Sequence, residues 1–368
     1  MNIKIENWIS EYESKYSLYE SFCSKISNLL NDLAKSHGIK IHLVESRAKT
    51  LDSFSEKIQR RGKKYNYPLK ELTDLAGIRI IVFYDKDIDK ICDILNNEFD
   101  IDTKNSVDKR ELLSHDKFGY NSVHKVISLD SNRIKLTEWK KYRDLKAEIQ
   151  VRTVLQHAWS VISHALEYKN ELEVPKLSRR KLSRLSGLLE LADEQFEELR
   201  KSQLKEIEES KNLIKKNELT QDINLISVEY YIGLSPLVNK MVDNLNLKFR
   251  TDKGKFKYPS PNQERINKEH DNTMLSELIS LCHHYGITTI DLLDNLIRNI
   301  DTSIEKYFAK LLLLHSYILF SVDLLLMIII GSKIQSKSEF EELKKITFFL
   351  DDDLNNIFSV RAALQKIE

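Results

Sequence analysis

The most informative stretch of this chain is residues 148–153, Glu148-Ile149-Gln150-Val151-Arg152-Thr153. Apolar and polar residues alternate along it, which predicts a strand that carries Glu148 and Gln150 on one face. The strand then passes through an Arg152-Thr153 turn into a helix with a polar stripe that begins at His157. A strand that presents acidic and amide groups and leads into a helix is typical of the ligand-binding edge of an α/β sheet.

Strands and helices alternate throughout the first half of the chain. Strand patterns cover residues 39–44, 76–84, 99–106, 122–129 and 144–151. Helical periodicity covers residues 5–36, 50–61, 86–97 and 153–168. The charged residues 108–117 are expected to form a mobile connection. This order predicts an α/β fold in which helices flank a mixed β-sheet.

The pattern changes after Pro175. Residues 176–216 predict one long helix or two antiparallel helices, and residues 273–366 predict several more. We therefore expect a first domain at residues 1–215 and an all-α C-terminal domain at residues 216–368. That second domain is expected to restrain the first until a regulatory protein partner or phage component binds, or else to build a homo-oligomer. The sequence favours neither role.

An almost continuous apolar stretch, residues 311–330, has the length of a membrane span. It contains Asp323, and an Asp near the centre of a bilayer costs about 2.5–3.5 kcal/mol. We therefore expect a buried helix of the C-terminal domain, and a membrane anchor is the less favoured alternative.

Composition limits the partners and the compartment. The 57 basic and 56 acidic residues nearly balance, so the charge of the whole chain predicts binding to neither nucleic acid nor membrane. Cys23, Cys92 and Cys282 are far apart and form no disulfide or zinc-ligand pattern. The N-terminus lacks the pattern of a signal peptide, so we expect a cytoplasmic protein.

Two upstream stretches complete the motif set. They are Thr73-Asp74-Leu75-Ala76-Gly77-Ile78-Arg79 and Phe118-Gly119-Tyr120-Asn121-Ser122-Val123-His124. In order and spacing, the three stretches resemble the synthetase domain of the RelA/SpoT family over residues 40–170. That family transfers pyrophosphate from ATP to the 3′-hydroxyl of a nucleotide acceptor. The resemblance implies a nucleotidyltransferase-like synthetase domain with this activity.

Two carboxylates are the candidates for catalysis. Magnesium prefers one or two carboxylates together with phosphate oxygens and water, and Asp74 and Glu148 lie within or beside predicted strands. We therefore expect both to bind Mg²⁺. Glu148 is also the candidate general base for the acceptor hydroxyl, although a carboxylate bound to a metal is a weak base.

The resemblance also assigns the nucleotide-binding residues. On the ATP side it implies that Arg47 and Arg79 stack against the adenine, and that Lys49 and Lys57 bind the phosphates. On the acceptor side it implies that Tyr120 stacks on the base. The remaining acceptor-binding candidates are His124, Gln150, Arg152 and His157.

Two positions leave the acceptor open. Asn121 and His157 stand where several small alarmone synthetases have Arg and Asn, and residues 156–159 resemble a subgroup with toxic members. Such relatives modify the 3′ end of transfer RNA or make adenosine alarmones. The acceptor is therefore GDP or GTP, an adenosine nucleotide, or transfer RNA. A nucleotide sensor without turnover is the least favoured alternative, because Asp74 and Glu148 are both present.

A transfer RNA acceptor needs a basic surface beside the pocket. The candidates for it are Lys140, Lys141, Arg143, Lys176, Arg179, Arg180, Lys181 and Arg184. A solvated helix face explains the last four equally well.

Overall fold

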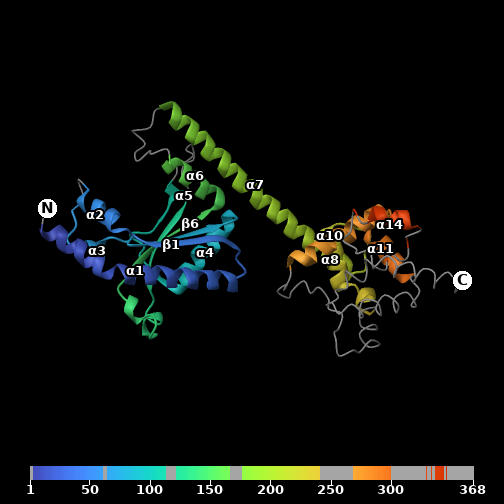
Figure 1. Cartoon of the computed structure of the whole chain (residues 1–368), viewed down its shortest axis with the longest axis horizontal. Helices are drawn as coiled ribbons and strands as arrows, with labels where there is room; N and C mark the ends of the chain where they lie inside the picture. The colour runs from blue at the N-terminus through green and yellow to red at the C-terminus, as the bar shows by residue number, and fades with distance from the viewer. Residues whose placement is uncertain are drawn as a thin grey trace. The chain divides into compact units, whose positions relative to one another are not determined.

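A computed structural model of the chain describes residues 3–60, 64–112, 122–165, 176–240 and 268–299, with several positions between 329 and 345 (Figure 1). The chain divides into two compact units, Met1–Arg200 and Lys201–Glu368. Each unit is described by itself below.

A six-stranded mixed sheet forms the centre of the first unit. Its strands are β1 (Ile41–Ala48), β2 (Ala76–Val82), β3 (Phe99–Ile101), β4 (Val107–Asp108), β5 (Val123–Leu129) and β6 (Lys146–Thr153). The order is β1-β2-β6-β5-β3, and β4 pairs with β5. Strands β2 and β6 run parallel and the other pairs are antiparallel, as expected for a mixed sheet.

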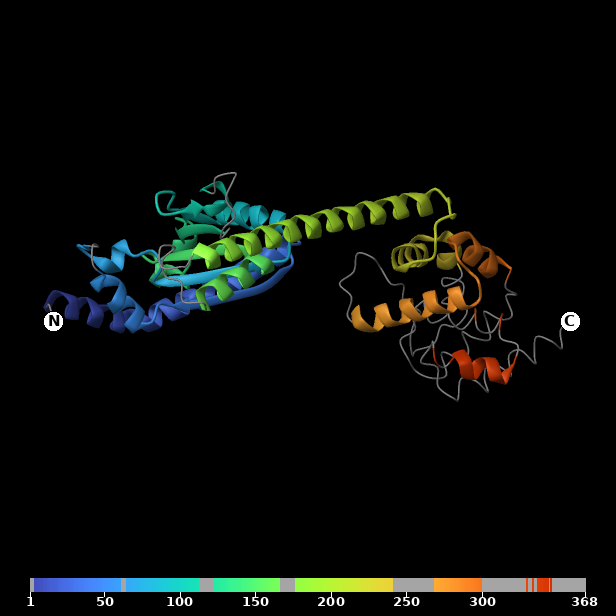
Figure 2. The same ribbon diagram turned by 90° about the horizontal axis from the view of Figure 1, so that it is seen from above.

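Helices flank this sheet. Those of the first unit are α1 (Ile3–Ser36), α2 (Leu51–Gln59), α3 (Pro68–Glu71), α4 (Asp85–Glu98), α5 (Lys109–Leu112), α6 (Val154–Ala165) and α7 (Lys176–Lys215), which continues into the second unit. Helix α1 runs along the sheet in both views (Figures 1 and 2). The region after Pro175 that predicted one helix or two is the single helix α7.

The core of the first unit lies between the sheet and helices α1 and α4. Aromatic and aliphatic residues of α1 at helical spacing are almost fully buried, among them Tyr12, Phe22 and Ile26. On the strands, the core side chains are those of the alternate positions, such as Ile78 and Ile149. Because strand side chains alternate between faces, the residues between these positions lie on the opposite face of the sheet.

The structure corrects two expectations within residues 99–112, and residues 113–117 lie outside the described ranges. The strand expected at 99–106 ends at Ile101, because Asp102 accepts hydrogen bonds from the backbone and side chain of Asn105 and closes a turn. The expected mobile connection at 108–117 begins with ordered structure, the end of β4 and helix α5. Arg110 of α5 is held there by Asp108 and Asp89, each at 2.7 Å.

The second unit is helical in its described part. Its helices are α8 (Leu225–Leu234), α10 (Lys268–His284), α11 (Ile290–Arg298) and α14 (Lys337–Leu343). Buried apolar residues such as Ile232, Leu278 and Leu293 form its core. Apart from Ile329, the helix expected at 311–330 lies outside the described residues. Within the described ranges, no helix combines the length and apolarity that a membrane span requires.

Candidate active site

One face of the sheet collects most of the predicted site residues. Arg47 of β1 lies opposite Gly77 of β2, which in turn lies beside Glu148 of β6. In the next row, Arg79 lies beside Gln150. Both rows occupy the alternate positions to the core residues, so they share the face that points away from α1 and α4.

Gly77 contributes no side chain to this face of the sheet. Its φ is not positive, and an added Cβ would meet only the Arg47 carbonyl oxygen, at the ordinary contact distance of 3.8 Å. The backbone therefore does not require glycine here. The missing side chain instead leaves space on the sheet between Arg47 and Glu148.

Two lysines converge on one carboxylate at the edge of this face. Lys49 follows β1 and Lys57 lies on α2, and their Nζ atoms donate to Asp74 Oδ2 at 2.9 and 2.5 Å. Asp74 lies two residues before the start of β2, and the Lys49 backbone N–H donates to Leu75 O at 2.9 Å. Thr50 caps α2 by accepting a hydrogen bond from the Ser53 N–H, which fixes the helix that carries Lys57.

The electrostatics keep Asp74 ionised. Burial raises the pKa of its carboxyl, but the hydrogen bonds from Lys57 and Lys49 outweigh burial, so the net pKa lies below its usual range. This corner therefore combines one fixed negative charge with two cations. Such a group suits a ligand that brings both phosphates and a metal ion.

Glu148 is held by neighbours on two strands. Its Oε1 lies 2.8 Å from His124 Nδ1 and accepts a hydrogen bond from Gln150 Nε2 at 3.0 Å. His124 Nε2 lies 2.9 Å from Ser122 Oγ. The hydrogen bond with His124 is the largest cause that lowers the pKa of Glu148, although burial opposes it. A carboxyl with a lowered pKa is a weak base and a good ligand for a cation.

The two carboxylates fit a divalent cation. Asp74 raises the pKa of Glu148, so the two charges act on each other. Asp74 Oδ1 is buried and has no hydrogen-bond partner among the described residues, whereas Oδ2 receives both lysines. In those same ranges no group of three or more His, Cys, Asp or Glu side chains has the arrangement of a metal site. Two carboxylates completed by phosphate oxygens and water are the donor set that Mg²⁺ commonly uses.

Two arginines lie next to Gly77 on this face of the sheet. Arg47 is exposed, and Arg79 NH1 lies 3.4 Å from Glu45 Oε2. Since Arg47 pairs with Gly77 and Glu45 pairs with Arg79, the two arginines are diagonal neighbours on one face of an antiparallel pair. Diagonal neighbours lie about 7–8 Å apart, which is within reach of one planar base.

The acceptor-side residues differ in their surroundings. His124 and Gln150 adjoin Glu148 directly. Arg152 is almost fully buried and contacts Gln150, with 3.4 Å between NH2 and Oε1. Burial lowers the pKa of His157, and Arg152 lowers it further. Tyr120 lies outside the described residues.

Sequence reasoning missed two supporting residues. Burial lowers the pKa of Lys109 on α5, and the charge of Glu148 opposes this shift. The Lys109 ammonium therefore interacts electrostatically with Glu148. Tyr12 of α1 donates its hydroxyl to Lys49 O at 2.6 Å and so ties the core to the lysine corner. Neither role has a local sequence signal, because each depends on a segment distant in the chain.

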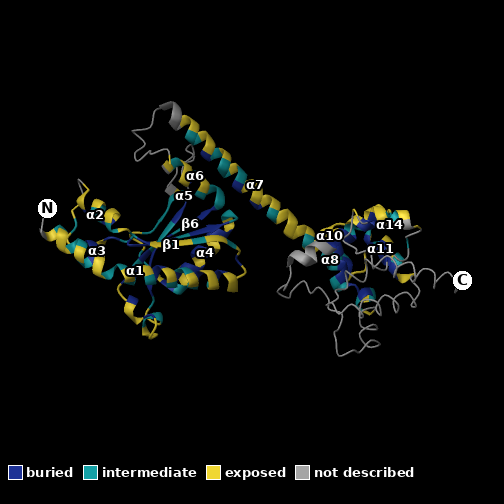
Figure 3. Ribbon diagram, in the orientation of Figure 1, coloured by how far each residue is buried: buried dark blue, intermediate teal, exposed yellow. Residues whose placement is uncertain are grey.

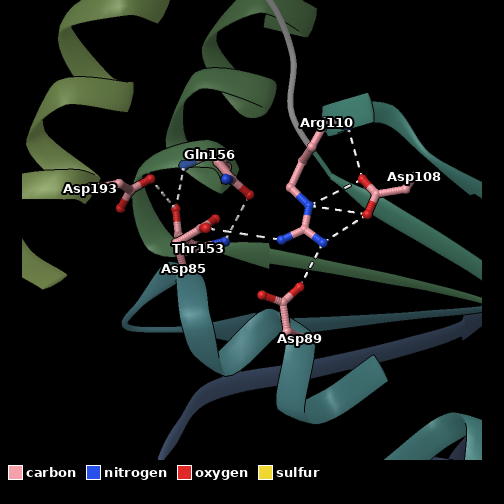
Figure 4. Close-up of polar contacts among 7 residues, drawn as sticks. All are labelled: Asp85, Asp89, Asp108, Arg110, Thr153, Gln156 and Asp193. Atoms are coloured by element: carbon pink, nitrogen blue, oxygen red, sulfur yellow. Dashed lines mark hydrogen bonds and ion pairs between the residues drawn. The ribbon is translucent and has the colours of Figure 1, made fainter. Parts of the chain in front are cut away.

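A third missed feature does have a signal. Thr153 ends β6 and forms a capping box with Gln156: Thr153 Oγ1 accepts from the Gln156 N–H, and the Gln156 amide oxygen accepts from the Thr153 N–H, both at 3.1 Å. The spacing Thr-x-x-Gln identifies this motif in the sequence. The Thr153 hydroxyl also donates to Asp193 Oδ2 on α7, at 2.7 Å (Figure 4).

Comparisons with known proteins find relatives of the first half of the chain. Residues 46–173 match the family model described as "Region found in RelA / SpoT proteins". The GTP pyrophosphokinase YwaC of Bacillus subtilis is 28% identical over 196 residues, which are 52% of this chain and 90% of that protein. The GTP pyrophosphokinase YjbM of the same organism is 29% identical over 164 residues, 44% of this chain and 72% of that protein.

Solved structures give similar coverage. A GTP pyrophosphokinase family protein from Streptococcus pneumoniae is 26% identical, with 52% of this chain and 94% of that chain covered and a TM-score of 0.43. Small alarmone synthetase 1 from Bacillus subtilis, bound to its product pppGpp, is 23% identical, with 52% and 98% covered and a TM-score of 0.44. The family match and the two pyrophosphokinase relatives support a synthetase domain of the RelA/SpoT family at residues 46–173.

Proposed function

We propose that this chain is an ATP:nucleotide 3′-pyrophosphokinase that makes (p)ppGpp-type alarmones from GDP or GTP. The observation that carries the proposal is the sheet face on which Asp74, Lys49 and Lys57 adjoin Glu148 and the Arg47–Arg79 pair. The names of the two Bacillus subtilis relatives support the guanosine acceptor.

On the donor side, Arg47 and Arg79 hold the adenine over Gly77, and Lys49 and Lys57 neutralise the phosphates. Asp74, through its unpartnered Oδ1, and Glu148 hold Mg²⁺. The bound ion supplies further neutralisation of the negative charge that develops during transfer. The cations and the sheet together fix ATP with its β-phosphorus accessible to the acceptor.

On the acceptor side, His124 and Gln150 orient the nucleotide and Tyr120 stacks on its base. The 3′-oxygen then attacks the β-phosphorus in line, the bond to the α-phosphate oxygen breaks, and AMP leaves. Glu148 accepts the proton of the hydroxyl directly or through water. Because the lowered pKa makes Glu148 a weak base, most of the acceleration comes from positioning and charge neutralisation.

Transfer RNA is the second candidate acceptor. Exposed basic residues favour it: Lys140, Lys141 and Arg143 follow one another near β6, and Arg180, Lys181 and Arg184 lie on α7. If these residues bind an RNA backbone, activity falls steeply as salt rises, whereas activity with a free nucleotide depends less on salt.

The test supplies purified protein with γ-labelled ATP and Mg²⁺ and offers GDP, GTP, AMP, ATP and bulk transfer RNA separately. Label on GDP or GTP supports the proposal. Label on an adenosine nucleotide would mean that the product is an adenosine alarmone. Label on transfer RNA would mean that the protein is instead a toxin that blocks translation. Absence of transfer to every acceptor, with Glu148→Gln as the matched blank, would sink the pyrophosphokinase proposal.

We also propose a cytoplasmic location and a regulatory or oligomerising role for the region after Lys215. Removing that region should change the rate of transfer or the toxicity of the protein in cells. Equal activity in the full chain and the truncated chain argues against regulation in cis.

A further inference from the structure

Lys109 lies in the same row across the sheet as Arg152. Strand β4 ends at Asp108, which pairs with Val123 of β5. One residue further on, the Lys109 backbone N–H donates to Ser122 O at 3.1 Å, so the antiparallel ladder continues by one row. The same shift along the β5–β6 ladder places Arg152 beside Ser122. Lys109 and Arg152 therefore lie on either side of Ser122.

This row belongs to the face of the sheet that carries Glu148. Two residues away on each strand, His124 of β5 pairs with Gln150 of β6, and both adjoin Glu148. Side chains two positions apart on a strand share a face, so Lys109 points toward the active site. Strands β5 and β6 are buried or intermediate in burial along their whole length (Figure 3), and Lys109 is intermediate. A ligand on this face can therefore reach Lys109.

Arg110 holds the short helix that begins with Lys109. Its guanidinium lies 2.7 Å from Asp89 on α4 and 2.7 Å from Asp108 on β4, and Figure 4 shows it among these carboxylates and Asp85. Because Arg110 and Lys109 are successive residues, Arg110 points toward α4 while Lys109 points toward the opposite face. A helix of four residues has little stability of its own, so these ion pairs fix the position of Lys109.

The positive charges of this row act on each other. Burial is the largest cause that lowers the pKa of Lys109, and Arg152 lowers it further, whereas Glu148 raises it. Arg152 itself is only 2% exposed. Two cations in a partly buried place are stabilised by an anionic ligand, and a phosphate is the strongest common acceptor of their hydrogen bonds. Since the lysine corner receives the phosphates of ATP in the proposed function, this second cationic group suits a phosphate of the acceptor.

We propose that Lys109 binds the 5′-phosphate of the acceptor nucleoside, with Arg152 beside it as a second positive charge and Arg110 as a positioning residue. This assignment rests on the proposed pyrophosphate transfer, because it takes the 3′-hydroxyl of the acceptor to lie at Glu148. A nucleoside whose 3′-oxygen reaches Glu148 can extend the other side of its ribose, with the 5′-phosphate, over the neighbouring strands β5 and β4. GDP, GTP and the terminal nucleoside of transfer RNA all carry a phosphate at this position.

The first test measures binding to the full chain without turnover. Mg²⁺ and an ATP analogue with a methylene group between its α- and β-phosphorus atoms fill the donor site, and calorimetry compares the dissociation constants of guanosine and GMP. In the wild type the 5′-phosphate should tighten binding by about 10- to 100-fold, as one hydrogen bond between charged groups does. Lys109→Met should reduce this gain to about threefold or less and leave the affinity for guanosine unchanged. Lys109→Arg should keep most of the gain.

Lys125→Met is the matched control. Lys125 lies on β5 and is partly buried, as Lys109 is, but it pairs with the core residue Ile149 and so belongs to the opposite face. This variant should keep the full gain from the 5′-phosphate. Adenosine and AMP are the second pair of probes. A larger Lys109-dependent gain with GMP indicates a free guanosine nucleotide as the source of the phosphate, and a larger gain with AMP indicates the terminal adenosine of transfer RNA.

Arg110→Met tests the positioning role. It should reduce the gain from the 5′-phosphate in part, because Lys109 remains but its helix is no longer held. The double variant Lys109→Met/Arg110→Met should lose no more of the gain than Lys109→Met alone, since Arg110 acts through Lys109. A general loss of structure would instead weaken the binding of guanosine and GMP alike.

Two results would overturn the proposal. One is a gain from the 5′-phosphate that is the same in the wild type and in Lys109→Met. The other is a wild type that binds nucleoside and nucleotide equally, which includes a wild type that binds none of the four probes. Both results come from binding alone, whereas the pyrophosphokinase proposal is decided by transfer from labelled ATP, so either can fail without the other.

Discussion

Asp74 and Asp193 lie at opposite ends of the central parallel strand pair, and their pKa values are shifted in opposite directions. Asp74 precedes β2, receives two lysines and has a lowered pKa. Asp193 contacts the last residue of β6, and burial raises its pKa to about 6. The Thr153 hydroxyl lowers the pKa of Asp193 without reversing the shift, and Asp85 of α4 raises it further.

The difference between the two carboxyls lies in their partners. Burial disfavours the charged form of both, and only Asp74 has cations within hydrogen-bond distance. The start of β2 therefore keeps a fixed negative charge that a metal ion can use. The end of β6 has a carboxyl that holds α7 in place whether or not it carries a charge. The following predictions test this contrast in order of decreasing effect.

Removing either carboxylate charge at the active site should abolish transfer. Asp74→Asn or Glu148→Gln should lower kcat by about a thousandfold or more, since each takes away a metal ligand and Glu148→Gln also removes the base. Pyrophosphate transfer from labelled ATP measures the effect, and circular dichroism checks the fold. Asp193→Asn is the matched control and should keep activity within a few fold. Equal losses of activity in all three variants would contradict the proposed difference between the active-site carboxylates and Asp193.

Removing one lysine should have a smaller effect. Lys57→Met should lower kcat/KM for ATP by about 10- to 100-fold, because one charge-assisted hydrogen bond to phosphate is lost. It should also raise the pKa of Asp74, which the pH profile of metal binding reports. Lys70→Met on α3, whose ammonium lies over the Tyr67 ring, is the control and should leave both measurements unchanged. A Lys57 variant with unchanged KM for ATP contradicts the phosphate assignment.

Neutralising Asp193 should stabilise the protein. Asp193 has a folded-state pKa of about 6 against an ordinary 3.8, so the folded state holds a proton that the unfolded chain has lost. The free energy of unfolding should therefore fall as pH rises from about 4 to about 6 and stay low above that range. Asp193→Asn should remove this slope and raise the free energy of unfolding at pH 7.5 by about 2 kcal/mol.

Urea unfolding at several pH values measures the effect of Asp193→Asn. Two other acidic groups near Asp193 also have raised pKa values: Asp85 on α4, and Glu190 on α7. Burial raises the pKa of both, so Asp85→Asn and Glu190→Gln are measured alongside to separate their contributions. An unchanged pH slope in Asp193→Asn would contradict the raised pKa.

Removing the Thr153 hydroxyl should have the smallest effect. Thr153→Val loses the cap of α6 and the hydrogen bond to Asp193, and should cost about 1–2 kcal/mol of unfolding free energy. Thr153→Ser keeps the hydroxyl and is the control. Unfolding in urea, followed by tryptophan fluorescence, compares the two. If both variants are equally stable, the hydroxyl does not attach α7 to β6.

Much of the fold was predictable from local pattern. Strand patterns predicted β2, β5 and β6, and helical periodicity predicted α1 and α4, because each pattern reflects which side chains face the core. The strand expected at 99–106 was wrong since the turn at Asp102 competes with alternation. The carboxylates and cations of the candidate site were named from the sequence, and the roles assigned to them remain predictions.

The residue types of the site and the order of strands and helices that carry them could be read from the amino-acid sequence, since both depend on neighbours along the chain. The folded chain was needed to show that His124 contacts Glu148, that Lys49 and Lys57 share Asp74, and that large apolar residues of α7 are exposed. These contacts depend on strand register and on packing between segments far apart in sequence. Whether a buried carboxyl meets a cation or another acid follows from that packing, and no local pattern records it.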